Sequence, residues 1–400
     1  MRLISFLGTG NYKSTEYAIN GKKVATNYVA CALATIFKPT EIMLIATDGA
    51  WKTHGEALSN ALREAGHPRP ERVHVPTGGE PDQLWEMFGS IVEAIRTCKD
   101  SVLLDITHGF RSQPFFAAAC IQYVQSVLPN PPRIQVVYAE YRETEPESPI
   151  WELTPFLEVL SWSRNLMIFL RTGQAGEVVK ATESFGRELD RQLPKEGAQL
   201  RKFATALGEF SNDFTTIRTG SMLTGKKASA QGLDENIYQT REEVAQKLPA
   251  LKYVLDQAHE MVEPLRTNGA RLSSTAGQRV LVNLAKLYQS LGRYGEACSI
   301  IREGWITLGA PENADEPGPN FDKKSRSDQE SRWHDTVKDD AREVGNIRND
   351  ILHAGFNDSP KKRKFNEQIT TMLAKWEAAI DASEGGSPED VSNHVKLSQS

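Results

Sequence analysis

The sequence predicts an α/β domain followed by an all-α region. Over the first 145 residues, short apolar runs alternate with segments of helical periodicity. Residues 143–149 (ETEPESP) are charged and hold two prolines, which favours a domain boundary there. Beyond them the strand signals stop and helical patterns continue toward the C-terminus. These three observations define the expected fold class.

Five apolar runs are expected to form the main strands: Leu3–Leu7, Glu41–Thr47, Arg72–Val75, Ser101–Ile106 and Arg133–Tyr141. Segments with helical spacing lie between them: Thr26–Phe37, Gly55–Glu64, Asp82–Thr97 and Ser112–Leu128. This alternation is typical of βαβ units, and it predicts a parallel, Rossmann-like sheet covered on both faces. Residues 16–24 depart from it, because Asn20-Gly21 between two strand-like runs indicates an inserted β-hairpin.

The second half of the chain is expected to be helical. The predicted helices are Leu153–Leu170, Gly176–Leu193, Ala198–Phe214, Arg241–Pro264, Gln278–Leu291, Gly295–Thr307, Trp333–Leu352 and Phe365–Ala382. Residues 313–331 are polar and rich in Pro, Gly and Asp, so they are predicted to form a loop or a disordered insertion. A mobile tail is expected after Ser383.

Composition excludes several classes of protein. Forty-seven Lys and Arg against fifty-two Asp and Glu give a net charge of −5, which argues against a histone-like protein or a nucleic-acid coat. The four cysteines are far apart, so they are expected to be buried thiols in a reducing cytoplasm rather than a zinc knuckle. The N-terminus does not have the pattern of a signal peptide, and no apolar stretch has the length of a membrane helix. A soluble cytoplasmic protein is therefore expected.

Small polar residues follow four of the expected strands. In an open α/β sheet, ligands bind outside the carboxyl ends of the strands. Glycines there let the backbone approach a ligand, and helix N-termini favour phosphate. Together the four loops favour a large, polar, phosphate-rich ligand. The candidate binding residues are Gly8, Thr9, Gly10, Asn11, Asp48, Gly49, Thr77, Gly78, Gly79, Asp105, Thr107, His108, Gly109, Phe110 and Arg111.

The residues at this edge also have other interpretations. A nicotinamide fingerprint would need glycine where Lys13 stands, and Asp48 lies 38 residues beyond Gly10 instead of about 20. Each glycine-rich loop alone could be an ordinary βα turn, and Asp105 could cap a helix or pair with Arg111. No metal-ligand cluster or Ser–His–Asp order surrounds His108, so spacing alone does not predict a hydrolase there.

One motif in the helical region could carry chemistry. Arg348 and His353 have an R-x4-H spacing, with Asn349 between them. A His near neutral pKa can transfer protons and an Arg can hold phosphate, so the pair could promote attack of a ribose 2′-OH on the adjacent phosphorus. Spacing alone equally fits a surface Arg and a His at a helix end. The two side chains converge only if the helix ends there, as Gly355 would allow.

The combination of these motifs resembles a known family. Gly8-Thr9-Gly10-Asn11-Tyr12, the hairpin at Asn20-Gly21, the string Asp105-x-Thr107-His108-Gly109 and the C-terminal R-x4-H together resemble the CRISPR-associated DxTHG-motif proteins. These proteins join a CARF sensor (CRISPR-associated Rossmann fold) to a HEPN ribonuclease. The resemblance implies a CARF domain at 1–147, a helical linker at 148–270, a HEPN domain at 271–385 with the insertion 313–331, and a flexible tail at 386–400.

The resemblance also implies a function. CARF domains of such proteins pair as a homodimer and bind a cyclic oligoadenylate made by a type III CRISPR complex. Binding activates a composite HEPN site that cuts single-stranded RNA without metal or cofactor and leaves a 2′,3′-cyclic phosphate and a 5′-OH. Arg348 and His353 would be the catalytic pair and Asn349 a supporting residue. Cyclic tetra-adenylate is the expected activator, with cyclic hexa-adenylate as the alternative. Protein oligomers larger than the dimer are left open.

Two other functions remain as alternatives. The chain could bind the messenger, or cut it as a ring nuclease, while its helical domain recruits a partner instead of cutting RNA.

The basic run at 361–364 (KKRK) could contact an RNA backbone, although a solvated helix start is the simpler interpretation.

Overall fold

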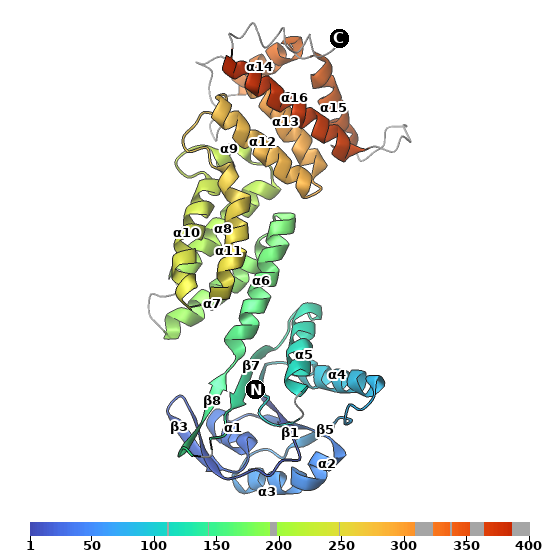
Figure 1. The fold of residues 1–400 in the computed structure, drawn as a ribbon, viewed down its shortest axis with the longest axis vertical. Helices are drawn as coiled ribbons and strands as arrows, with labels where there is room; N and C mark the ends of the chain where they lie inside the picture. The colour runs from blue at the N-terminus through green and yellow to red at the C-terminus, as the bar shows by residue number, and fades with distance from the viewer. Residues whose placement is uncertain are drawn as a thin grey trace. The chain divides into compact units, whose positions relative to one another are not determined.

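The computed structural model describes residues 1–109, 112–142, 144–192, 198–247, 249–308, 323–336, 338–352 and 364–385. It divides into two compact units, 1–161 and 162–400, which are described separately (Figure 1). The first contains a sheet with helices, and the described part of the second is helical. The predicted fold class, an α/β domain followed by a helical region, is therefore confirmed. Among the described residues, none of the helices is both long and apolar enough to span a bilayer.

The first unit is built on a sheet of eight described strands in the order β3-β2-β8-β7-β6-β1-β4-β5. The strands are β1 Arg2–Leu7, β2 Thr15–Ile19, β3 Lys22–Thr26, β4 Glu41–Ala46, β5 Glu71–His74, β6 Ser101–Asp105, β7 Arg133–Ala139 and β8 Glu147–Glu152. Strands β7, β6, β1, β4 and β5 are mutually parallel, with Leu3 of β1 opposite Ile42 of β4 and Leu103 of β6. Their carboxyl ends therefore lie at one edge.

The predicted hairpin is present as the antiparallel pair β2 and β3. Its turn residues Asn20 and Gly21 have φ angles of +50° and +75°, which is the conformation that Asn-Gly favours in two-residue hairpins. The prediction that strands stop beyond residues 143–149 is wrong, because β8 continues to Glu152 and overlaps the start of the linker expected at 148–270. It pairs antiparallel with β7 and parallel with β2, and so joins the hairpin to the main sheet. Pro149 of β8 cannot donate a ladder hydrogen bond, but its carbonyl accepts one from Glu140 N at 2.9 Å.

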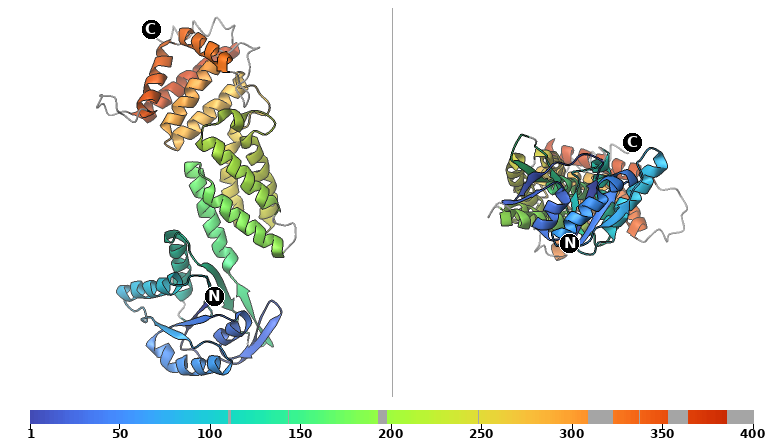
Figure 2. Two further views of the ribbon diagram at one scale, coloured as in Figure 1. Left: turned by 180° about the vertical axis from the view of Figure 1, so that it is seen from behind. Right: turned by 90° about the horizontal axis from the view of Figure 1, so that it is seen from below.

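Helices cover both faces of the sheet (Figure 2). They are α1 Val29–Phe37, α2 Asp48–Ala50, the π-helical turn η1 Trp51–Gly55, α3 Glu56–Glu64, α4 Pro81–Arg96 and α5 Gln113–Val127. Alternate residues of β1 serve the two cores: Leu3 and Leu7 pack with α1 and α3, whereas Ile4 and Phe6 pack with α4 and α5. Each such fully buried side chain contributes about 1.5–3 kcal/mol to folding. The four cysteines are buried free thiols, as expected.

The helical region begins with α6 Thr154–Thr172 and continues through α7 to α16. Its other described helices are α7 Gly176–Gln192, α8 Ala198–Thr215, α9 Thr219–Leu223, α10 Ser229–Lys247, α11 Pro249–Val262, the 3₁₀ turn η2 Glu263–Leu265, α12 Thr275–Ser290, α13 Tyr294–Leu308, α14 Lys323–Thr336, α15 Lys338–Leu352 and α16 Phe365–Gly385. Trp376 of α16 is fully buried, and its Nε1 donates to Gln278 Oε1 of α12 at 3.0 Å. Tyr288 of α12 donates to the Phe214 carbonyl at 2.6 Å.

Three helix predictions need correction. The segment 241–264 covers the end of α10, all of α11, which starts at Pro249, and part of the turn η2. The segment 333–352 likewise spans the end of α14 and all of α15, and α9 was not predicted.

The loop predicted at 313–331 is wrong for residues 323–331, which form the start of α14; residues 313–322 lie outside the described residues. Arg326 of α14 bonds the carboxylate of Glu303 on α13, and Arg302 of α13 pairs with Glu330. Gln329, which lies between Arg326 and Glu330 in the sequence, is buried. The segment is polar because it packs onto α13 through charges, and a hydrophobic pattern therefore does not reveal it. The tail beyond 385 lies outside the described residues.

Candidate functional site at the sheet edge

The predicted binding loops meet at the carboxyl edge of the parallel strands. From β1 the chain proceeds to β4 and β5 on one side and then returns to β6 on the other, so strand order reverses between β1 and β6. Such a switch point is where open α/β sheets bind ligands. The loops after β1, β4, β5 and β6 carry the predicted residues to this edge. Phe110 and Arg111 lie outside the described residues.

Asp105 organises the loop that follows β6. Its carboxyl group is completely buried and accepts hydrogen bonds from Ser5 Oγ at 2.6 Å and from the Thr107 backbone N–H at 2.9 Å. The Thr107 hydroxyl also bonds Asp105, and it accepts from Ala139 N at 2.8 Å. These contacts use the carboxylate within the loop, so Asp105 would act on a ligand by positioning the backbone around it.

Two glycines allow the loops after β1 and β6 to approach closely. A Cβ atom on Gly8 would lie 3.1 Å from Gly109 N and 3.2 Å from the Tyr12 hydroxyl. Gly109 has a φ angle of +112°, and a Cβ atom there would lie 1.7 Å from Gln113 Oε1. A side chain at Gly8 would push the two loops apart, whereas one at Gly109 would displace the Gln113 side chain of α5. Thr9, Gly10 and Asn11 are exposed beside them.

An aromatic stack lies between these loops. Tyr12 stacks on His108 with ring centroids 4.1 Å apart and on His54 at 4.4 Å. The Tyr12 hydroxyl accepts from Gly8 N at 2.8 Å, and burial raises the pKa of Tyr12 to about 12. His54 Nε2 lies 2.7 Å from the Gly10 carbonyl oxygen. The stack therefore fixes the conformation of the loop after β1.

His108 stacks on Tyr12 in a partly buried position that shifts its pKa. Burial lowers the pKa of its imidazole, nearby Asp105 acts in the opposite direction and His54 lowers it further. Its Nε2 atom is buried without a hydrogen-bond partner among the described residues. The sequence pointed to His108 but not to His54. The helix was expected to start at Gly55, whereas His54 is positioned by the π-helical turn η1, which the sequence did not predict. Gly55 within η1 is the available signal: a Cβ there would lie 2.5 Å from the Trp51 ring.

The loop after β4 contains a charged cluster. Asp48 pairs with Arg72 Nη2 at 2.7 Å and lies 3.6 Å from His74 Nε2, both on β5. The hydrogen bond from Arg72 is the main cause that lowers the pKa of Asp48. The guanidinium of Arg72 lies over the Trp51 ring, 5.4 Å from its centroid. Sequence reasoning missed Arg72 and His74, because a strand position does not show which end of the strand a long side chain reaches.

The loop after β5 differs from the prediction in how its donors are used. The backbone N–H groups of Gly78 and Gly79 donate to Gln83 Oε1 at 3.1 and 3.0 Å. These donors are therefore already occupied by a side chain of α4, while Thr77 is exposed beside them.

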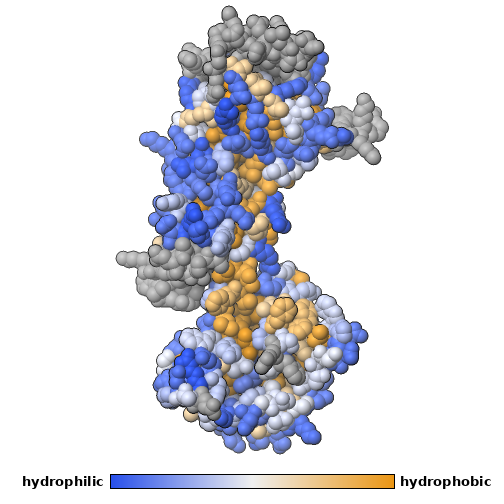
Figure 3. Space-filling view, in the orientation of Figure 1, coloured by the Kyte–Doolittle hydropathy of each residue, from blue (hydrophilic) through white to orange (hydrophobic). Residues whose placement is uncertain are grey.

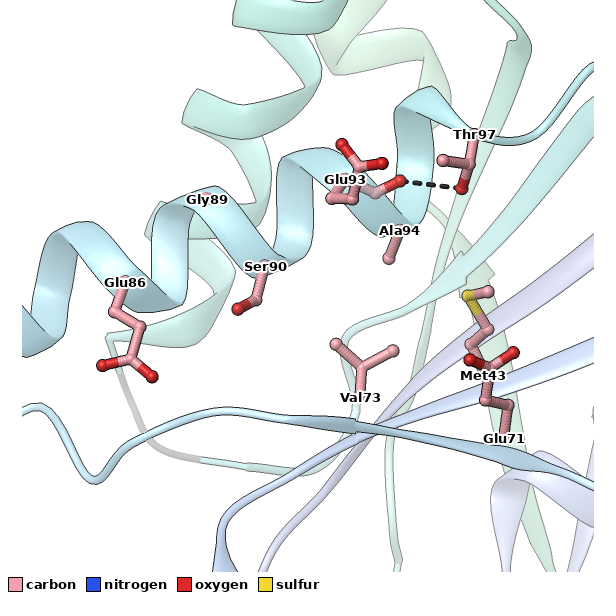
Figure 4. Close-up of a pocket in the computed structure, with 9 residues that line it drawn as sticks. All are labelled: Met43, Glu71, Val73, Glu86, Gly89, Ser90, Glu93, Ala94 and Thr97. Atoms are coloured by element: carbon pink, nitrogen blue, oxygen red, sulfur yellow. Dashed lines mark hydrogen bonds between the residues drawn. The ribbon is translucent and has the colours of Figure 1, made fainter.

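One pocket of the first unit does not lie at the predicted site. A pocket of about 560 Å³ lies between β5 and α4 (Figure 4), and it contains none of the predicted binding residues. Glu71, Glu86 and Glu93 line it, so its charge is unsuited to phosphate. Among the described residues, no group of three or more His, Cys, Asp or Glu is placed to hold a metal ion. The chemistry of the sheet edge suits an anionic ligand with hydrogen-bonding groups.

In the helical unit, the candidate catalytic residues lie at the end of α15. Arg348 is half-buried, and its Nη1 lies 3.5 Å from the side-chain oxygen of exposed Asn349. Helix α15 packs on α13, where a Cβ on Gly295 would lie 3.1 Å from Ile351. His353 and the basic residues 361–363 lie outside the described residues. Lys364 is described, and it pairs with Glu367 at 3.0 Å.

Comparison with known proteins shows which class of domain the first unit resembles. Residues 2–142 match the family model described as "CRISPR system endoribonuclease Csx1, CARF domain". This part of the chain is therefore similar to CARF domains of the Csx1 type, and the chain also has a CRISPR-associated relative.

That relative is the CRISPR-associated protein MJ1674 of Methanocaldococcus jannaschii, which is 23% identical over 194 residues, or 47% of this chain and 27% of the relative. The aligned region of this chain thus spans about a quarter of the relative's length. A solved structure of Enterococcus italicus Csm6 bound to cyclic hexa-2′-fluoro-hexa-dAMP aligns over 100% of this chain and 98% of its own, with 12% identity and a TM-score of 0.44.

Proposed function

We propose that the protein is a cyclic-oligoadenylate-activated endoribonuclease that cuts single-stranded RNA without a metal ion in type III CRISPR defence. The observation that carries this proposal is the similarity of residues 2–142 to CARF domains of the Csx1 type. Its parallel strands bring Gly8–Asn11, Asp48–Gly49 and Thr107–Gly109 to one edge, at the switch in strand order. Exposed residues there, with glycines that permit close approach, suit the phosphates and base edges of an oligonucleotide. Cyclic tetra-adenylate is the proposed activator.

The cutting site is assigned to the helical unit. Arg348 would hold the scissile phosphodiester and offset the charge that develops on its oxygens. His353 would transfer the proton of the attacking 2′-OH or of the leaving 5′ oxygen, and Asn349 would orient the phosphate. The bond formed joins the 2′ oxygen to phosphorus, and the bond broken is the one from phosphorus to the 5′ oxygen. The products are a 2′,3′-cyclic phosphate and a 5′-OH.

One Arg–His pair supplies a single proton-transfer group, so we place the site between two protomers of a homodimer. An exposed hydrophobic surface supports pairing of the first unit. Figure 3 shows hydrophobic side chains gathered over α5 and the start of α6. Phe115 and Phe156 are 78% and 71% exposed in these two helices, and Leu160 is 55% exposed. Large contiguous apolar patches on a soluble unit commonly mark interaction surfaces.

The test is an RNA cleavage assay with cyclic tri-, tetra- and hexa-adenylate, run in EDTA. We expect cleavage only with one of these rings, a 2′,3′-cyclic phosphate on the product, and loss of cleavage in His353→Ala with ring binding retained. Undiminished cleavage by His353→Ala would remove the site assignment. Ring binding by a dimeric protein without any cleavage would favour the sensor that recruits a partner, and consumption of the ring itself would favour a ring nuclease.

A further inference from the structure

The cluster of Asp48, Arg72, His74 and Trp51 has features that a ligand contact at Asp48 alone does not explain. The guanidinium of Arg72 packs over the Trp51 ring, and the Arg72 side chain is only 25% exposed. Its Nε atom is buried and has no hydrogen-bond partner among the described residues. A guanidinium that is pre-positioned over an aromatic ring and has an N–H group without an acceptor is typical of a site that recognises an oxyanion.

Asp48 is held by Arg72 and His74 much more loosely than Arg72 is held by the fold. Its side chain is 84% exposed, and the same oxygen, Oδ1, makes both the 2.7 Å contact to Arg72 and the 3.6 Å contact to His74. Exposed ion pairs contribute little to stability because water competes for both partners. The carboxylate can therefore be exchanged for another anion without cost to the core.

The cluster is continuous with the binding edge. Strand β4 lies between β1 and β5, so the loop after β4 separates the Gly8–Asn11 loop from Arg72. A Cβ on Gly49 would lie 3.9 Å from Thr9 Cγ2, which places the residue next to Asp48 against the loop after β1. A ligand with several phosphates that occupies the β1 loop would extend over Asp48.

We infer that Arg72 and His74 form a phosphodiester subsite of the sheet edge, and that Asp48 covers this subsite in the absence of ligand as a carboxylate that the phosphate displaces. This inference rests on the proposed function for the identity of the ligand, but its geometry does not depend on RNA cleavage. It changes the role of Asp48 from a ligand contact to a competitor, and it assigns the contact to Arg72. Asp48 thereby sets how much phosphate-bearing ligand is needed to fill the site.

The experiment first uses inorganic phosphate alone, at constant pH and ionic strength, and follows the imidazole C–H signal of His74 by NMR. The signal is assigned with His74→Gln. We expect phosphate to shift it in the unmodified protein, to shift it at several-fold lower concentration in Asp48→Asn, and to leave it unchanged in Arg72→Gln. An unresponsive His74 signal, or a higher phosphate requirement in Asp48→Asn, would overturn the inference.

Calorimetric titration with cyclic tetra- and hexa-adenylate then separates the subsite from the proposed function. We expect Arg72→Gln to weaken ring binding about tenfold, as for loss of one charged hydrogen bond, and Asp48→Asn to strengthen it. Arg96→Gln and Glu93→Gln are the matched controls, because these residues form an exposed pair with a 2.7 Å contact on α4 of the same unit.

The outcomes are distinguishable. If the rings bind and the Arg72 and Asp48 variants behave like the α4 controls, the subsite is wrong while ring sensing stands. If no ring binds but phosphate shifts His74 as expected, the anion subsite stands and the proposed activator is wrong.

Discussion

The two units obtain their candidate functional groups in opposite ways. In the α/β unit, the groups come from four loops that are separated by up to a hundred residues, and the parallel sheet brings them to one edge. In the helical unit, Arg348 and Asn349 are neighbours at the end of one helix. A site assembled by a sheet can be disturbed by any of its strands. A site carried on one helix depends on how that helix is seated and on what approaches it from outside.

The largest expected effect tests whether the two sites can be separated. Arg348→Ala should lower ring-activated RNA cleavage by a factor of about 100 or more, because it removes the charge that we propose stabilises the transition state. Ring affinity, measured by calorimetry, should stay the same, because the proposed ring site lies in the other unit. Arg342→Ala is the matched control, an exposed Arg on the same helix α15. Equal loss of activity in both variants would show that α15 as a whole, rather than Arg348, had been disturbed.

The seating of the helices can be tested at Gly304 of α13. A methyl group there would lie 1.9 Å from Cζ2 of Trp376, a rigid and fully buried ring. Gly304→Ala should therefore lower the free energy of unfolding by about 1–3 kcal/mol or more, as overpacking does. Gly345→Ala on α15 has nothing within 4 Å and should instead raise it by about 0.5–1 kcal/mol. Urea unfolding measures both, and equal shifts would contradict the packing of α13 on α16.

The corresponding test of the sheet edge is Gly109→Ala. The φ angle of +112° is strained for alanine, and Phe6 Cβ would lie 3.3 Å from the new methyl group. We expect a loss of about 1–3 kcal/mol and weaker ring binding. Gly89→Ala on α4, which has nothing within 4 Å, provides the control. If Gly109→Ala bound the ring normally, the backbone conformation at Gly109 would not matter for the site.

A smaller effect is expected from pH through His108. Burial lowers its pKa below the ordinary value of 6.5, so the unfolded chain binds a proton at a pH where the folded chain does not. The contribution to stability is therefore complete above about pH 6.5 and is lost as the pH falls through the lowered pKa. In His108→Phe, which can keep the stack on Tyr12, unfolding free energies measured by urea titration should depend less on pH in this window. An unchanged slope would mean that other groups dominate it.

The smallest effect concerns thiol reactivity, and it compares the units directly. Burial raises the pKa of Cys120 in the first unit and of Cys298 in the second to about 12. Both thiols should be unreactive toward an aromatic disulfide reagent in the native protein. In increasing urea, labelling located by mass spectrometry should show which unit opens first. Fast labelling of either cysteine without urea would contradict its burial.

The sequence by itself determined the features that depend on local chemistry. The alternation of apolar runs predicted the five parallel strands, Asn20-Gly21 predicted the hairpin, and the glycine-rich loops marked the sheet edge. It was less informative where stability comes from partners distant in the chain. Strand β8 has a proline and charged residues, and it is a strand because β7 and β2 flank it. The start of α14 is helical because its charges pair with those of α13.

Only the tertiary structure decided how the candidate residues are used. Sequence order does not show that Gln83 occupies the donors of Gly78 and Gly79, that Asp105 faces inward, or that His54 stacks on Tyr12. Arg72 and Asp48 are 24 residues apart and meet because β4 and β5 are adjacent. The physical reason is that hydrogen bonds and ion pairs are satisfied by whichever group the packing brings within about 3 Å. A pattern of residue types places a group on an element, and packing chooses its partner.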